Sequence, residues 1–205
     1  VVAGVDEDSS EATTNTPSEP TTEAPTETSS EAPTETSSEA PTETSSEAPT
    51  ETTTDAPVSG DMVEVLNAND LTQGSISTST TFGKFVITAS SEGTVTVDGS
   101  NKSCGDYSFT QRIKLGGKGT ADYRSVKFNA ASAGNIIMCA MSSNGTQVRT
   151  VSLYNEAGEA IQTIEVPGDE LKEYTFAVPS AGTYYVASES GGLNIYLIGS
   201  DMALN

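Results

Sequence analysis

Residues 107–115, Tyr-Ser-Phe-Thr-Gln-Arg-Ile-Lys-Leu, decide the fold class because apolar and polar side chains alternate along them. Successive side chains of a β-strand point to opposite faces, so Phe109 and Ile113 share one face while Arg112 and Lys114 share the other. A strand with one apolar and one polar face is typical of an antiparallel sheet that covers a core on one side only.

Short stretches of the same kind recur from residue 84 to residue 198, separated by Gly, Asn, Asp and Ser and without a helical period. About ten strands in fewer than 150 residues favour an all-β, antiparallel β-sandwich of jelly-roll type over a closed barrel. Residues 136–141 are apolar on both faces and predict a central strand, whereas residues 63–71 fit a short edge strand or a linker equally well. The expected strands are residues 84–89, 94–97, 107–115, 125–129, 135–142, 148–154, 160–166, 174–178, 183–188 and 193–198.

Residues 1–60 have a different composition, since they hold no Lys, no Arg and no aromatic residue. The octapeptide Glu-Ala-Pro-Thr-Glu-Thr-Ser-Ser begins at Glu23, Glu31 and Glu39 and returns in altered form at Glu47. Such a segment cannot bury enough apolar surface to offset its ordering entropy, so we expect a disordered, extended acidic linker. Residues 61–205 are then the folded module. The chain starts at Val1 without a signal segment, which predicts a piece of a longer polypeptide.

The net charge of −20 has to be divided between these two parts. Of the 29 acidic residues 14 lie in residues 1–60, which leaves 15 acidic and 9 basic residues, a net charge of −6, for residues 61–205. An acidic domain repels phosphate backbones, so nucleic acid is not an expected partner. No apolar run has transmembrane length, so no membrane partner is expected either.

Several kinds of catalysis are disfavoured by the residues that are missing. The chain has no His, no Gly-x-Ser-x-Gly elbow and no Asp-x-Asp-x-Asp-Gly calcium loop. Cys104 and Cys139 stand 35 positions apart without further thiol or imidazole ligands, so no zinc site is expected. We predict no catalytic residue, no metal ligand and no cofactor. The two cysteines permit one disulfide but do not demand one, and the apolar run around Cys139 favours a buried free thiol that acts as a small hydrophobic residue.

Positive charge is concentrated in one part of the module. Residues 112–127 hold five of the nine basic residues and a single acid, Asp122, and Lys102 precedes them in a predicted loop over residues 99–105. Such a patch suits an anionic ligand, although Lys114 and Lys127 equally fit a solvated outer sheet face. Trp is absent and the Tyr residues mostly fall inside predicted strands, so charge rather than ring stacking is expected to bind a sugar polymer.

Five stretches in the same order resemble a module appended to bacterial pectate lyases, carbohydrate-binding module family 77. The resemblance implies a β-sandwich that binds homogalacturonan of low methyl esterification, a pectin, through lysines and without calcium. Lys102 and Lys172 match the lysine cluster of the family, Lys118 is the choice for the third position, and Lys114 competes for that place. The stretches are residues 108–117, 124–128, 148–158, 179–185 and 194–196.

The resemblance also implies a context for the module. We expect a monomeric, non-catalytic part of a larger secreted, cellulosome-associated enzyme that degrades the plant cell wall and carries a pectinolytic domain. Two other interpretations remain open from the sequence. One is a structural or protein-docking β-sandwich that spaces domains and whose lysines only confer solubility, and the other is a lyase in its own right.

Overall fold

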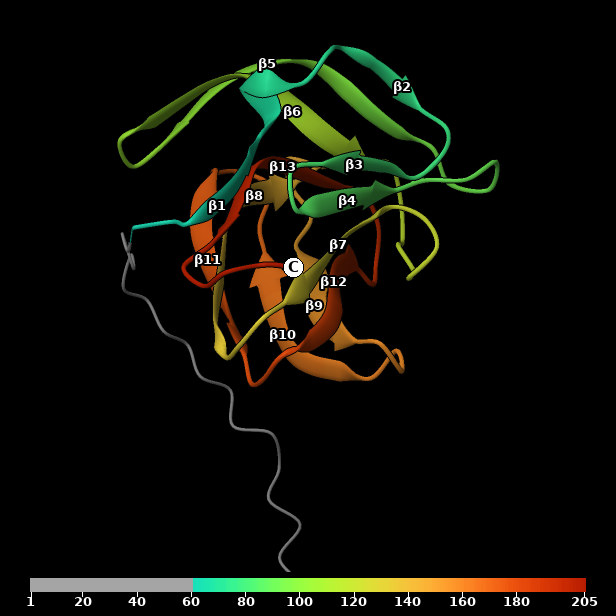
Figure 1. Ribbon diagram of the computed structural model, residues 1–205. Coiled ribbons are helices and arrows are strands. Elements are labelled where there is room, and N and C mark those ends of the chain that lie inside the picture. The colour runs from blue at the N-terminus through green and yellow to red at the C-terminus, as the bar shows by residue number, and fades with distance from the viewer. Residues whose placement is uncertain (1–60) are drawn as a thin grey trace, which may run out of the picture. The chain divides into compact units, whose positions relative to one another are not determined.

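The computed structural model describes residues 61–205, and the linker predicted over residues 1–60 lies outside the described part. The described residues form thirteen strands in two antiparallel sheets, which confirms the predicted β-sandwich (Figure 1). A turn of 3₁₀ helix, Ala68–Asp70, follows the first strand, β1 (Glu64–Asn67). The stretch 63–71, which the sequence left open, is therefore ordered and pairs through β1 with β13.

The larger sheet has the strand order β11-β8-β13-β6-β5-β2, with β1 paired to β13 beside this path. Residues 136–142 of its strand β8 are buried, and β8 lies between β11 and β13, so the predicted central strand is confirmed. The strands are β2 (Gly74–Ile76), β5 (Val95–Cys104), β6 (Tyr107–Leu115), β8 (Gly134–Ser142), β11 (Lys172–Val178) and β13 (Leu193–Ser200).

The smaller sheet has the order β10-β9-β12-β7-β4-β3. Its strands are β3 (Thr80–Phe82), β4 (Phe85–Thr88), β7 (Ser125–Ala130), β9 (Arg149–Asn155), β10 (Ala160–Val166) and β12 (Gly182–Ser188). β10 and β3 form its two edges, and the central pair β12 and β7 is in register from Gly182 opposite Ala130 to Ala187 opposite Ser125.

The main core lies between the two sheets. Ile113 and Ile195 of the larger sheet and Val126 and Val151 of the smaller one are fully buried in a single apolar cluster. Burying a side chain of this size contributes about 1.5–3 kcal/mol, so the facing apolar rows hold the sheets together. The alternation predicted for β6 is confirmed at Ile113, while Lys114 beside it points away from this core.

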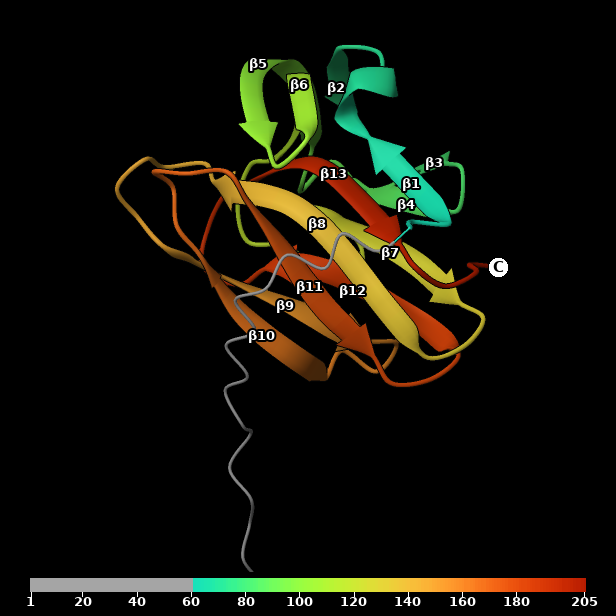
Figure 2. The ribbon, with the colours of Figure 1, turned by 90° about the vertical axis from the view of Figure 1, so that its left-hand side faces the viewer.

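A second, smaller apolar cluster lies on the opposite face of the larger sheet, which we call the outer face. Ile136, Met138 and Ala140 of β8 face the main core, so the alternating Cys139 and Met141 face outward. The closed end of the β5–β6 hairpin packs there, and Figure 2 shows this hairpin above β8 and β11. The cluster consists of Cys104, Phe109, Cys139, Met141, Leu171, Tyr196 and Leu197.

Two bulges allow the hairpin to close over this outer face. The pairing of β5 with β6 shifts between Gly99 and Lys102, and the pairing of β13 with β8 shifts between Ile195 and Leu197. A bulge bends its strand and re-aims side chains. In β13 the shift lets Tyr196 and Leu197, which are neighbours along the chain, join the same outer cluster.

The predicted loop over residues 99–105 is wrong, because β5 continues through it to Cys104. Gly99, Ser100 and Asn101 have the composition of a turn, but the bulge takes up the extra residue and the ladder resumes at Lys102. The reversal comes later, at Gly105, whose φ of +55° favours glycine. Strands β2 and β3, each three residues long, were not predicted.

Candidate functional site

A row of side chains crosses four strands on the outer face of the larger sheet. Lys114 of β6 is paired in register with Thr96 of β5 on one side and with Asn194 of β13 on the other, and Asn194 is paired with Met141 of β8. Side chains of directly paired residues lie on the same face, so Lys114 stands in the middle of this row. Lys114 is half-buried, and Met141 joins the row to the outer cluster.

The neighbouring row is held by an ion pair. Arg112 donates from Nε to Asp98 Oδ1 at 2.6 Å and from Nη2 to Asp98 Oδ2 at 3.2 Å. The hydrogen bond from Arg112 is the main reason why the pKa of Asp98 is lowered, and the charge of Lys114 lowers it further. Beyond Arg112, the hydroxyls of Tyr196 and Ser100 are 2.8 Å apart. Arg112 is therefore neutralised within the module, although the sequence counted it in the basic patch.

Lys102 reaches the same area from the hairpin. Its register partner is Phe109, a member of the outer cluster, so the exposed Lys102 side chain lies on the side of the hairpin that faces the cluster. Cys104, two residues further along β5, is buried in that cluster. Lys102 thus projects from a strand rather than from the predicted loop, and it borders the outer face.

Lys172 is next to the outer cluster in sequence but belongs to the other face of the larger sheet, because its register partner Ala140 is part of the main core. It begins edge strand β11, as the sequence indicated, and follows directly on Leu171 of the cluster. Its Nζ lies 3.2 Å from Glu170 Oε2, with both side chains more than half exposed. An exposed ion pair of this kind contributes about 0–1 kcal/mol to stability.

Lys118 is placed differently from the other three predicted lysines. It is exposed in the loop between β6 and β7, and the loop is fastened to the smaller sheet by a hydrogen bond from the Gly119 N–H to the Ser188 carbonyl. A Cβ on Gly119 would approach the Arg124 carbonyl oxygen within 2.1 Å, which fixes this loop segment closely. No contact joins Lys118 to the outer cluster within residues 61–205.

Tyr107 is a candidate that sequence reasoning missed. It was placed with the strand tyrosines expected to be buried or half-buried, yet its side chain is 38% exposed. It pairs with Cys104 at the hairpin end, and its ring stacks on Phe109 at a centroid distance of 6.3 Å and an angle of 21°. Its position close to the turn at Gly105 could have predicted this exposure, since residues at a hairpin end have few neighbours to cover them.

Glu173 introduces negative charge beside the same cluster. It is paired in register with Cys139, and burial raises the pKa of its carboxyl group. Within the described residues its Oε1 and the Oδ1 of Asn194 are buried without a hydrogen-bond partner. The charge of Glu173 opposes ionisation of the Cys104 and Cys139 thiols.

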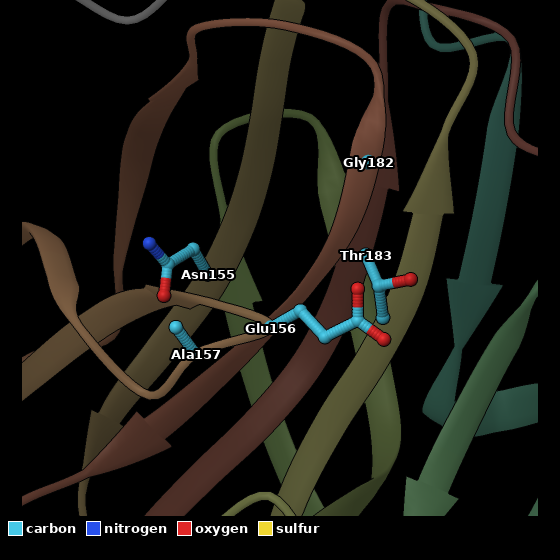
Figure 3. A pocket seen from close by; sticks show the side chains of 5 residues that line it. All are labelled: Asn155, Glu156, Ala157, Gly182 and Thr183. Atoms are coloured by element: carbon cyan, nitrogen blue, oxygen red, sulfur yellow. The ribbon is translucent and has the colours of Figure 1, made fainter.

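Two hollows lie on the smaller sheet. One, of about 460 Å³, is lined by Asn155, Glu156, Ala157, Gly182 and Thr183, and Figure 3 shows Glu156 extended toward Thr183. A neighbouring hollow of about 190 Å³ also includes Thr183 and is bordered by Lys84 and Lys127. None of the four predicted lysines lines either hollow.

Residues 61–205 contain neither a candidate metal-binding group nor a candidate membrane-spanning helix. No group of three or more His, Cys, Asp or Glu side chains is arranged to hold a metal ion. No helix in this part of the chain has the length and apolar character needed to cross a membrane.

No family model matches the chain, and no curated protein matches it either. Solved structures do match, among them the one described as "BiXyn10A CBM1 APO", at 14% identity and a TM-score of 0.34, covering 69% of this chain and 99% of that one. A CBM22-1 xylan-binding domain of Xyn10C from Paenibacillus barcinonensis matches at 14% identity and a TM-score of 0.41, over 70% and 97% of the two chains. The module CsCBM6-3 from Clostridium stercorarium, solved with cellobiose, matches at 12% identity and a TM-score of 0.30. The match covers 70% of this chain and 89% of that one. Likenesses this distant do not identify a ligand for this chain.

Proposed function

We propose that this chain is a non-catalytic carbohydrate-binding module that holds an anionic plant polysaccharide on the outer face of the larger sheet. The observation that carries the proposal is the arrangement of Lys102 and Lys114 beside one apolar cluster, on the paired strands β5 and β6. A linear polymer lying along these two strands meets both cations, and Lys172 is proposed as a further contact where the polymer passes the start of edge strand β11.

The proposed ligand is homogalacturonan of low methyl esterification. Its repeating carboxylates suit lysine ammonium groups, which are flexible point charges that tolerate varied carboxylate orientations. The resemblance to family 77, whose lysine cluster Lys102 and Lys172 match and whose first matching stretch contains Lys114, supports this choice of polymer. Lys114 takes the third position in the proposal because it lies on the outer face, and Lys118 is assigned an additional contact in the loop between β6 and β7.

The same proposal places the module in a secreted protein, where it would hold an attached pectinolytic domain at the plant cell wall. Each exposed lysine–carboxylate contact contributes about 0.2–1 kcal/mol, so several must act together. The resulting affinity is micromolar or weaker, falls with added salt, and falls with methyl esterification because esters carry no charge. No calcium is required, since the cations are supplied by side chains.

The test compares two double variants that remove the same charge from opposite sheets. Lys102→Ala/Lys114→Ala is expected to weaken retention on polygalacturonate in affinity electrophoresis about tenfold. Lys84→Ala/Lys127→Ala is expected to retain binding within about twofold. Lys172→Ala and Lys118→Ala, made singly, then measure the contribution of each end of the face.

Three results would overturn the proposal. Equal weakening by both double variants would mean unspecific charge attraction, and stronger weakening by Lys84→Ala/Lys127→Ala would move the site to the smaller sheet. Equal retention on fully methylated pectin would exclude recognition of the carboxylates. If no polysaccharide retains the wild-type chain, the structural or docking module is the better interpretation.

A further inference from the structure

The two cysteines of the chain meet in the outer cluster. Cys104 is the last residue of β5, directly before the turn at Gly105, and Cys139 lies in the middle of β8. Their exposed fractions are 6% and 0%, and the structure holds both as free thiols. Phe109, Met141, Leu171, Tyr196 and Leu197 complete the cluster around them.

The two side chains belong to one cluster of seven buried residues. A hydrogen bond between the thiols, together with burial, raises the pKa of Cys139, and the same hydrogen bond lowers the pKa of Cys104. Two residues 35 positions apart in sequence are thus brought together in one buried cluster, which is the first requirement for joining them.

We propose that Cys104 and Cys139 are the two halves of a disulfide that fastens the β5–β6 hairpin to strand β8. In the larger sheet β5 is separated from β8 by β6 and β13, so no backbone ladder joins these two strands. The bond would add a link that the sheet lacks, and at the point where the hairpin passes over the outer face. This proposal stands independently of the ligand proposed above.

The chemistry needs an external oxidant, for which a small-molecule disulfide such as oxidised glutathione is sufficient. The thiolate of one cysteine attacks a sulfur of that disulfide and releases one small thiol, which takes up a proton. The second cysteine, as thiolate, then attacks the mixed disulfide and releases the second small thiol. Since both sulfurs are buried in the folded module, we expect the exchange during folding, before the hairpin closes over the cluster.

The wild-type chain gives the first test. It is unfolded with reductant, refolded in oxidised and reduced glutathione, then denatured and treated with iodoacetamide. We expect a mass lower than that of the reduced chain by about 2 Da, no alkylated cysteine, and a peptide pair containing Cys104 and Cys139 in an unreduced digest. Two alkylated thiols per chain, or a bond between two chains, would overturn the proposal.

The second test measures the mechanical role of the bond. Adding reductant to the oxidised wild type is expected to lower Tm by about 5–15 °C. In Cys104→Ser and Cys139→Ser variants the reductant should leave Tm unchanged. An oxidised wild type whose Tm does not respond to reductant would show that the bond does not fasten the hairpin.

Discussion

Arg112 and Lys114 stand two residues apart on the same face of β6, yet only one of them keeps its charge for a ligand. Arg112 is held by both carboxylate oxygens of Asp98, while neither ion pair recorded within residues 61–205 involves Lys114. The sequence placed both in one basic patch, because a strand pattern assigns a face but not a cross-strand partner. Arg112 is therefore fixed by an ion pair within the module, and Lys114 is the cation of the two that can bind a ligand.

The Arg112–Asp98 pair predicts a loss of stability in acid. Because Arg112 lowers the pKa of Asp98 below its ordinary value of 3.8, the folded state gains stability from the ionised carboxylate above that pH. The gain disappears as the pH falls through the lower pKa of the folded state. We expect urea denaturation to show a larger loss of stability from pH 4 to pH 2 in the wild type than in Asp98→Asn. Equal losses would contradict this role for the pair.

Glu170 predicts a gain of affinity when its charge is removed. Its carboxylate competes with the polymer for Lys172 at 3.2 Å, so Glu170→Gln should bind polygalacturonate about 1.5- to 5-fold more tightly. Glu156→Gln is the matched control, because it removes the same charge from a hollow on the smaller sheet. Titration calorimetry at low salt measures both, and an equal gain in the control would show only a net-charge effect.

Elements were predicted well wherever one strand carried its own pattern. β6 and β10 have the predicted bounds, and β8 is the buried central strand that its two apolar faces indicated. β5 was cut short because turn-forming residues at positions 99–101 occupy a bulge, which depends on the partner strand. β2 and β3 are too short to show an alternation. The outer cluster could not be predicted from the sequence either, since it depends on two bulges and on how the hairpin packs against the sheet.

The hairpin itself offers a prediction at this scale. Phe109 is 2% exposed, and its ring lies 5.5 Å from that of Tyr196, so it anchors the hairpin to β13. Phe109→Ala should lower the free energy of unfolding by about 3 kcal/mol because it leaves a cavity in the outer cluster. Thr110→Ala, at the next and exposed position, is the control. A loss below about 1 kcal/mol for Phe109→Ala in urea denaturation would mean that the hairpin is held by its ladder alone.

At the scale of the whole molecule, the two faces of the larger sheet have different roles. The inner face builds the main core with the smaller sheet, while the outer face combines an apolar cluster with the lysines that border it. The positions of the four candidate lysines along the chain were predictable, but their grouping was not. Lys102 and Lys114 lie on the paired strands β5 and β6, whereas Lys172, 70 residues after Lys102, starts edge strand β11 and shares the face of Ala140.

The charge of the complete chain leads to the last prediction. Residues 1–60 add 14 acidic and no basic residues to a module whose own net charge is −6. Tethered negative charge lowers the local concentration of an anionic polymer, so residues 61–205 alone should bind polygalacturonate more tightly than the full chain at low salt. The difference should shrink as salt rises, because the Debye length falls from about 30 Å at 0.01 M to about 8 Å at 0.15 M. Titration calorimetry of both chains over this range measures it. A difference that persists at 0.15 M salt would instead point to a direct contact between residues 1–60 and the binding face.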